Sequence, residues 1–186
     1  IDDQDKEIED LILKGESYLT QIGDVTGISV KFDKRDTFRP GAKFAEYELK
    51  GVPVRIAIGK RDLENNTVEV ARRDTLEKQT VSQEDVVKVV SDLLDEIQEN
   101  LFFRAKSYRK DHTTVVNTFE EFKEAIDKVG GFVYAHWDGT SETEDKIKDL
   151  TKATIRCIPL DNKFEEGTCV LTGEKSTQRV LFAKAY

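Results

Sequence analysis

The stretch GVPVRIAIGKRDL, residues 51–63, decides the fold of the first half of the chain. Gly51 and Pro53 interrupt the preceding segment, and Val54–Ile58 then has the composition of a β-strand. One charged side chain, Arg55, stands among its apolar residues. A short strand between helical segments is typical of an α/β fold, and Arg55 stands out as a charged residue within it.

The segments before this strand predict two helices and one strand. Apolar residues recur at helical spacing from Asp5 to Asp24, which predicts an amphipathic helix with an acidic outer face. Ile28–Asp33 alternates as a strand does. Arg39-Pro40-Gly41 breaks the chain before a short helix over Ala42–Leu49.

The segments after residue 63 predict further strands and a long helix. Asn65-Asn66 marks a turn before a strand over Thr67–Arg73, and a short strand or loop reaches Val81. Apolar residues from Val86 onward follow helical spacing as far as Tyr108. Residues 1–108 are therefore expected to form one α/β domain with a mixed sheet.

The pattern restarts after Asp111 and predicts a second, small α/β domain over residues 109–186. Helices are expected over 118–129 and 141–150, and strands over 132–137, 155–158 and 179–183.

Composition limits the class of protein. The chain has 186 residues and a net charge of -8, and its apolar runs are too short for a membrane span or a signal peptide. Two cysteines are too few for a disulfide framework, which indicates a reducing compartment and makes the cytoplasm the expected location. The chain starts at Ile1 and contains no Met, so we expect it to be a piece of a longer protein.

Positive charge is concentrated in one region of this acidic chain. Residues 31–61 contain nine Lys and Arg residues against four acids, whereas residues 1–30 contain two against eight. Such a positively charged region would attract a nucleic-acid phosphate backbone, but a surface of mixed charge is more often only exposed to solvent. Composition alone favours the solvated face.

No catalytic constellation stands out. Cys157 or Cys169 could be paired with His112 or His136, but nothing in the sequence activates either thiol. The sequence contains neither of the two common glycine-rich phosphate loops.

The residues around the opening stretch resemble the anticodon-binding domain of prolyl-tRNA synthetases. The resemblance begins with Arg35-Asp36, continues through Arg39-Pro40-Gly41 and covers Tyr47–Leu63. Arg72-Arg73-Asp74-Thr75, Phe103-Arg104-Ala105, Asp111-His112-Thr113 and the last eight residues, RVLFAKAY, are similar to the archaeal and eukaryotic type of that enzyme, so the resemblance extends over essentially the whole chain. It implies the α/β anticodon-binding domain of class II synthetases followed by the C-terminal, often zinc-binding, domain, without the catalytic domain.

The resemblance implies the residues that would read tRNA-Pro. The family's contacts to the two guanines common to proline anticodons fall on Glu48, Arg55, Arg61, Asp62 and Lys78. A carboxylate can accept from the guanine N1 and N2 edge, and Arg or Lys can donate to O6 and N7. The alternative is that Glu48 and Arg55 form only a structural ion pair. Lys60 replaces a Pro that is usual before Arg61-Asp62. The basic loop around Arg39 and Lys43 is expected to contact the RNA backbone.

The family's zinc site is expected to be lost. Its four Cys ligands correspond here to Asp138, Thr143, Cys169 and Thr172, and neutral hydroxyls hold zinc weakly. We expect packing of Trp137, Ile158, Val170 and Phe182 to hold the fold instead.

The resemblance also implies a function for the larger enzyme. Proline–tRNA ligase attaches proline to tRNA-Pro using ATP and Mg²⁺, which belong to a catalytic domain upstream, and the full-length enzyme is expected to be a homodimer. The C-terminal Tyr186 is expected to point towards that active site, unless it is an ordinary chain end. A freestanding interaction module with the same fold remains the alternative. Domains of this class usually start with an apolar strand, of which only Ile1 could remain. Either the given chain begins just after that strand, or the strand is lost and leaves a gap in the sheet that is exposed or filled by another molecule.

Overall fold

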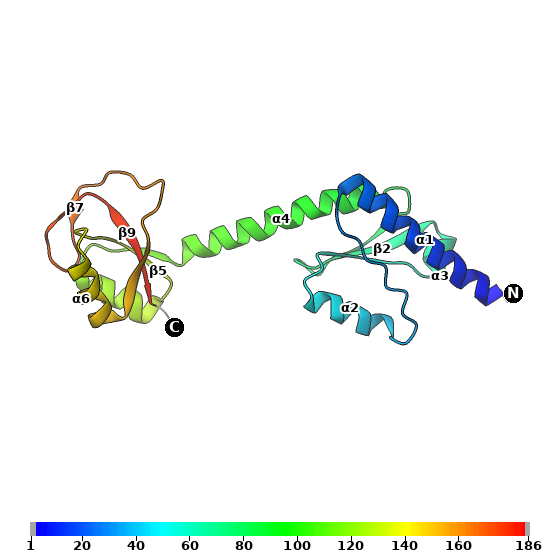
Figure 1. Cartoon of the computed structure of the whole chain (residues 1–186), viewed down its shortest axis with the longest axis horizontal. Coiled ribbons are helices and arrows are strands. Elements are labelled where there is room, and N and C mark those ends of the chain that lie inside the picture. Colours follow the sequence, from blue (N-terminus) through cyan, green and yellow to red (C-terminus); the bar gives the residue numbers. More distant parts are fainter. Residues whose placement is uncertain (1–2, 185–186) are drawn as a thin grey trace. The chain divides into compact units, whose positions relative to one another are not determined.

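The computed structural model describes residues 3–184 and divides the chain into two compact units (Figure 1). The first unit extends to Phe102 and the second begins at Phe103, so the division falls within helix α4 (Val86–Asp111). The predicted domain boundary at 108/109 lies in the same helix. No helix within residues 3–184 is long and apolar enough to cross a membrane.

Helices and strands alternate in the first unit, as the sequence pattern predicts. The helices are α1 (Asp3–Thr26), α2 (Pro40–Leu49), α3 (Lys60–Glu64) and the first part of α4. Pro40 occupies the first turn of α2, where its missing N–H removes no hydrogen bond. The α/β class is therefore confirmed.

Three antiparallel strands form the sheet of this unit, in the order β1 (Val54–Ala57), β2 (Thr67–Arg72) and β3 (Lys78–Ser82). Side chains alternate between the two faces of a strand. Val68, Val70 and Val81 lie in the core with residues of α1 and α4, such as Ile22 and Val90. The other face of the sheet carries Arg55 and lies towards α2, because the Arg55 guanidinium stacks on Phe44 of that helix.

The predicted strand at Ile28–Asp33 does not form. These residues have no regular secondary structure, and β1 is an edge strand among the strands that the structure describes. Alternation of apolar residues indicates which side chains are buried, whereas a strand also needs a neighbouring strand to which its backbone can hydrogen-bond. Val30 packs against the core, and a Cβ on Gly15 of α1 would lie 2.5 Å from the ring of Phe32, so this segment is fixed by side-chain packing.

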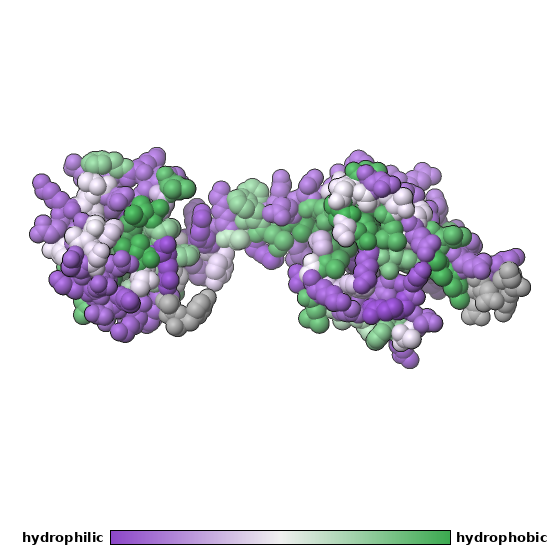
Figure 2. Space-filling view, viewed as in Figure 1, coloured by the Kyte–Doolittle hydropathy of each residue, from purple (hydrophilic) through white to green (hydrophobic). Residues whose placement is uncertain are grey.

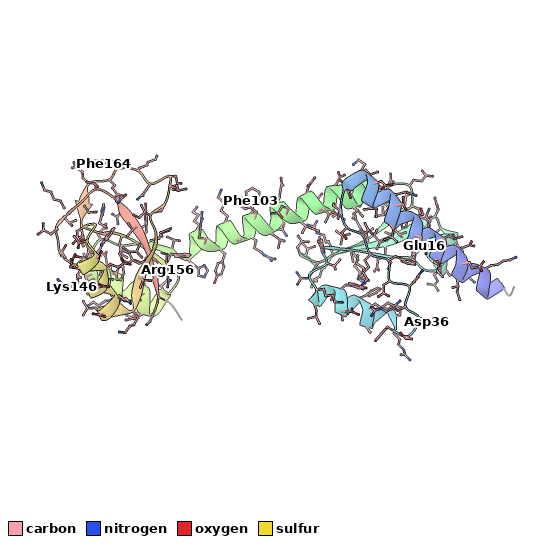
Figure 3. All side chains as sticks on the ribbon, viewed as in Figure 1. Glu16, Asp36, Phe103, Lys146, Arg156 and Phe164 are labelled. Atoms are coloured by element: carbon pink, nitrogen blue, oxygen red, sulfur yellow. The ribbon has the colours of Figure 1, made fainter. Side chains whose placement is uncertain are left out.

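Charged contacts fix the loop that leads to α2. The Asp33 carboxylate accepts hydrogen bonds from the Arg35 side chain at 2.9 and 2.6 Å, and these bonds hold the Asp33 pKa well below its ordinary value. Arg35 also pairs with Glu46 of α2 at 2.7 Å. Lys34 lies 3.5 Å from Glu16 of α1, which Figure 3 labels. The loop thereby connects α1 to α2.

The second unit is built on a mixed sheet in the order β4 (Thr113–Val115), β5 (Phe132–His136), β9 (Arg179–Lys184) and β6 (Ala153–Cys157). The β4–β5 pair is parallel and the other pairs are antiparallel. A small hairpin joins β7 (Gly167–Thr168) to β8 (Lys175–Ser176). The helices are α5 (Phe119–Glu124), which continues as a π-helical turn (Ala125–Val129), and α6 (Ser141–Thr151).

Two of the four residues expected to hold the second unit lie in its core. Val170 and Phe182 are buried, and Trp137 packs against the core while remaining partly exposed. The expectation for Ile158 is wrong: its side chain is exposed, because β6 ends at Cys157 and the chain leaves the sheet there. Helix α6 begins at Ser141, where the sequence predicts it, and its N-terminal cap is Thr140, whose side chain accepts a hydrogen bond from the Thr143 N–H.

Candidate nucleic-acid interface

The face of the first sheet opposite the core contains a hollow of about 240 Å³. We call it the sheet hollow. Figure 2 shows a mostly hydrophilic surface over α2, which borders it, and apolar side chains gathered over the neighbouring part of the unit. Its lining comes from α2, the three strands and the segments that join them: Phe44, Tyr47, Glu48, Val52, Pro53, Arg55, Ala71, Arg72, Arg73, Leu76 and Lys78.

Three of the predicted anticodon contacts meet in this hollow: Glu48 from α2, Arg55 from β1 and Lys78 from β3. They are up to 30 residues apart in the sequence, and the antiparallel pairing of the strands brings them together. Ala71 of β2 pairs with both Arg55 and Lys78, so the two cations flank its small side chain. The hollow exists because Ala71 does not fill the space between them.

Arg55 is held in place by its surroundings, but one of its donor nitrogens, Nη1, has no hydrogen-bond partner within residues 3–184. The guanidinium carbon lies 3.5 Å from the centroid of the Phe44 ring, and Nη1 lies 3.7 Å from the Glu69 carboxylate. Only 16% of the side chain is exposed, and Nη1 has no hydrogen-bond partner among the described residues. A buried donor in that state costs free energy in the absence of a ligand.

Glu69 of β2, which the sequence reasoning missed, faces both cations. Its Oε1 lies 3.3 Å from the Lys78 Nζ and 3.7 Å from the Arg55 Nη1. Arg55 therefore pairs with Glu69, and the alternative of a purely structural Glu48–Arg55 ion pair finds no support in this contact. The signal available in the sequence was an acid between Val68 and Val70, which places its side chain on the polar face.

The end of α2 is fixed next to the hollow. Arg73 donates from Nε to the Glu48 carbonyl oxygen at 2.8 Å, while the Glu48 side chain is exposed. Tyr47, one residue earlier, has a buried hydroxyl without a hydrogen-bond partner in the described part of the chain. Phe44, Tyr47 and Arg73 are further residues of this surface, and the sequence reasoning did not assign them to the anticodon site.

Arg61 and Asp62 do not line the hollow. Both lie in α3, which begins at Lys60, three residues after the end of β1 at Ala57. The Asp62 Oδ2 accepts a hydrogen bond from the Gly59 N–H at 2.8 Å and so caps the helix that contains it. Lys60 is the first residue of this helix, a position that Lys can occupy as well as Pro.

The two residues expected at the RNA backbone differ in their surroundings. Arg39 is exposed at the N-terminal cap of α2. Lys43 donates from Nζ to the Asp33 carbonyl oxygen at 3.1 Å, and its side chain is only 18% exposed. Lys43 therefore stabilises the loop before α2, and Arg39 is the more accessible of the two.

Three of the four residues at the family's zinc positions, Asp138, Thr143 and Thr172, form a hydrogen-bonded cluster with Thr140. The Asp138 Oδ2 accepts from the Thr143 hydroxyl at 2.7 Å and from the Thr172 hydroxyl at 2.9 Å. Its Oδ1 accepts from the Thr140 hydroxyl at 2.9 Å and from the Thr140 N–H at 3.1 Å. We call these four residues the Asp138 cluster. Burial raises the Asp138 pKa, but the hydrogen bonds from Thr143, Thr140 and Thr172 outweigh it and lower this pKa to about 2.

This arrangement does not fit a tetrahedral zinc site. Both hydroxyls at ligand positions donate their protons to the carboxylate, and Cys169, the one thiol of the set, is buried. Within residues 3–184 no group of three or more His, Cys, Asp or Glu side chains could hold a metal ion. The expectation for Tyr186 concerns a residue outside the described range.

Comparisons with known proteins match each of the two units to the domain that the sequence resemblance implies for it. Residues 4–93 match the family model described as the anticodon binding domain, and residues 119–186 match the model of the prolyl-tRNA synthetase C-terminal region.

Curated proteins that carry the name proline–tRNA ligase are similar along most of the chain. The protein from Flavobacterium johnsoniae is 66% identical over 159 residues, which are 86% of this chain and 32% of the relative. The protein from Flavobacterium psychrophilum is 58% identical over 182 residues, 98% of this chain and 37% of the relative. The chain thus spans about a third of the length of these relatives. It belongs to the prolyl-tRNA synthetase family and corresponds to the anticodon-binding domain and the C-terminal region of that enzyme.

Proposed function

We propose that this chain recognises the anticodon of tRNA-Pro as the C-terminal part of a proline–tRNA ligase. The sheet hollow supports the proposal most directly, because Glu48, Arg55 and Lys78 converge there from three separate elements. The names of the relatives support it independently.

The chemistry of the hollow suits guanine. Guanine has two acceptors, O6 and N7, to which Arg55 and Lys78 can donate hydrogen bonds. It also has donors at N1 and N2, from which the Glu48 carboxylate can accept hydrogen bonds. The buried Arg55 Nη1, which has no partner among the described residues, would gain an acceptor when RNA binds. Arg61 and Asp62 on α3 would contact a different part of the anticodon loop, and Arg39 would meet the RNA backbone.

A filter-binding comparison tests the proposal. The chain is titrated with tRNA-Pro and with a tRNA-Pro in which adenine replaces both anticodon guanines. We expect about 10–100-fold weaker binding of the substituted tRNA, since a base-specific contact of this kind contributes about 1–3 kcal/mol. Equal affinity for the two tRNAs would leave the freestanding interaction module as the better reading.

The activity of the whole enzyme is part of the same proposal. Activation of proline with ATP and Mg²⁺ would take place in a catalytic domain outside this chain, in a homodimer. The chain alone is expected to bind tRNA-Pro and to show no aminoacylation. Addition of proline and ATP to the purified chain with tRNA-Pro checks this expectation.

The Asp138 cluster supports the further proposal that this chain has lost the family's zinc. A carboxylate held by three Thr side chains joins the end of β5 to α6 and to the 168–174 turn without a metal. Elemental analysis of the purified chain should give far less than one zinc per molecule, and a stoichiometric zinc that survives dialysis against a chelator would contradict the proposal.

A further inference from the structure

Glu69 occupies the middle of the polar face of the first sheet. In the strand register it pairs with Ala57 of β1 and Thr80 of β3, while Arg55 and Lys78 both pair with Ala71, two residues further along β2. Arg55 and Lys78 are therefore the diagonal neighbours of Glu69 on the two flanking strands, at a separation that long side chains can bridge.

A single carboxylate oxygen contacts both cations. Oε1 lies 3.3 Å from Lys78 and 3.7 Å from Arg55. With one acid between two bases, this part of the hollow keeps one positive charge. Without Glu69, the like charges of Arg55 and Lys78 would flank the small Ala71 side chain, and each cation would turn away from the other.

The contacts are loose enough to be rearranged by a ligand. Glu69 is 38% exposed and Lys78 is 54% exposed, and ion pairs at such exposure contribute little to stability because water screens them. Arg55 is restrained on its other side by the Phe44 ring. The pair with Glu69 thus fixes the direction of each cation at little cost, and an incoming base can still displace it.

We propose that Glu69 is a positioning residue for anticodon recognition, which acts through Arg55 and Lys78 and makes the hollow selective for guanine over other RNA. The inference rests on the proposed function. Its physical basis is that two unrestrained cations attract any RNA phosphate, whereas two cations held at fixed directions favour a base whose acceptors match them.

Glu69→Gln separates these effects, because it removes the charge and keeps the shape. Glu84→Gln is the matched control, since Glu84 is exposed in the turn before α4 and forms no ion pair with Arg55 or Lys78, whose partner among the described residues is Glu69. Both variants and the parent chain are titrated with tRNA-Pro and with the adenine-substituted tRNA-Pro. The preference, defined as the ratio of the two affinities, is compared.

In E69Q we expect the preference for the guanine anticodon to fall about tenfold, the size of one base-specific contact. Affinity for the substituted tRNA should rise about two- to fivefold, because a negative charge is lost from the RNA-facing surface. E84Q should keep the preference of the parent chain. Thermal unfolding should show all three proteins folded.

The failures of the two proposals are distinguishable. A parent chain without preference overturns the proposed function and this inference together. If the parent chain prefers the guanine anticodon and E69Q keeps the same preference, only the inference about Glu69 is overturned. This holds even if the affinities of E69Q for both tRNAs rise together, through the lost negative charge, or fall together, through a damaged structure. If E69Q does not fold, Glu69→Asp, which shortens the carboxylate arm, replaces it and should lower the preference by the same reasoning.

Discussion

The sheet hollow and the Asp138 cluster both gather polar side chains from separate elements, but they differ in how far those side chains are satisfied. Every oxygen of the Asp138 carboxylate accepts hydrogen bonds from within the second unit. In the hollow, the Arg55 Nη1 and the Tyr47 hydroxyl are buried without a partner in the described part of the chain. A cluster that serves stability closes its hydrogen bonds internally, whereas a surface that serves binding leaves donors for a ligand.

This comparison predicts the largest loss of stability for Asp138→Ala. The substitution removes the acceptor of the Thr143 and Thr172 hydroxyls, and hydrogen bonds to a charged group contribute about 1.5–3 kcal/mol. We expect the free energy of unfolding to fall by about 2–3 kcal/mol in urea titrations followed by the fluorescence of Trp137, the single Trp of the chain.

The same variant should bind tRNA-Pro as the parent chain does. Asp145→Ala, at an exposed position of α6, is the control and should change stability by less than about 0.5 kcal/mol. If D138A lost more RNA affinity than D145A, the Asp138 cluster would serve RNA binding as well as stability, and its contrast with the sheet hollow would be wrong.

Arg55→Met should give the opposite result. The variant removes a donor that has no hydrogen-bond partner among the described residues at Nη1, and replaces it by an apolar chain of similar length. We expect the affinity for tRNA-Pro to fall about 30-fold, equivalent to about 2 kcal/mol. Stability should stay within about 0.5 kcal/mol, because an apolar replacement of an incompletely paired charge is often neutral.

Arg104→Met makes the same charge change at an exposed position of α4 and is the control in both assays. If R55M destabilised the chain by several kcal/mol, Arg55 would have to be counted with the structural residues.

Acid should weaken the Asp138 cluster by a smaller amount. The pKa of this carboxyl in the folded chain, about 2, lies below its ordinary value of 3.8. Its contribution is therefore fully present above the ordinary value and is lost as the pH falls towards 2. In urea titrations from about pH 5 to about pH 2, the stability difference between the parent chain and Asp138→Asn should narrow by about 1–2 kcal/mol. A difference that stays constant with pH would show that the charge of Asp138 contributes little.

Helices were the part of the fold that the sequence predicted best. Apolar spacing located α1 and α4, and the break at Arg39-Pro40-Gly41 placed the start of α2 at Ala42, two residues after its observed start at Pro40. Ile28–Asp33 shows the limit of this reasoning: its alternation describes which side chains are buried, while a strand also needs a hydrogen-bonding neighbour, which need not be close in the sequence. Ile158 was likewise expected in the core, but its side chain is exposed because β6 ends at Cys157.

The candidate site was predicted in part. The resemblance indicated Glu48, Arg55 and Lys78, and the structure brings these three together. Glu69 was missed because an acid in an alternating strand is ordinarily a solvent-facing residue, and only the strand register shows that it lies between two cations. Likewise, the sequence predicted a poor zinc site at Asp138, but the hydrogen bonds of the Thr hydroxyls to that carboxylate depend on the fold of the 168–174 turn.

The position of β9 in its sheet has a consequence for the synthesis of the second unit. β9 pairs with both β5 and β6, although it follows both of them in the sequence. A ribosome adds about 5–20 residues per second, so β5 has to wait a few seconds for its partner. Through that interval Val133 and Ala135 of β5 lack Phe182 and Val180, the residues of β9 that pair with them in the folded unit. The nascent chain therefore carries an open strand edge until β9 emerges, and this is the period in which the unit depends most on protection from aggregation.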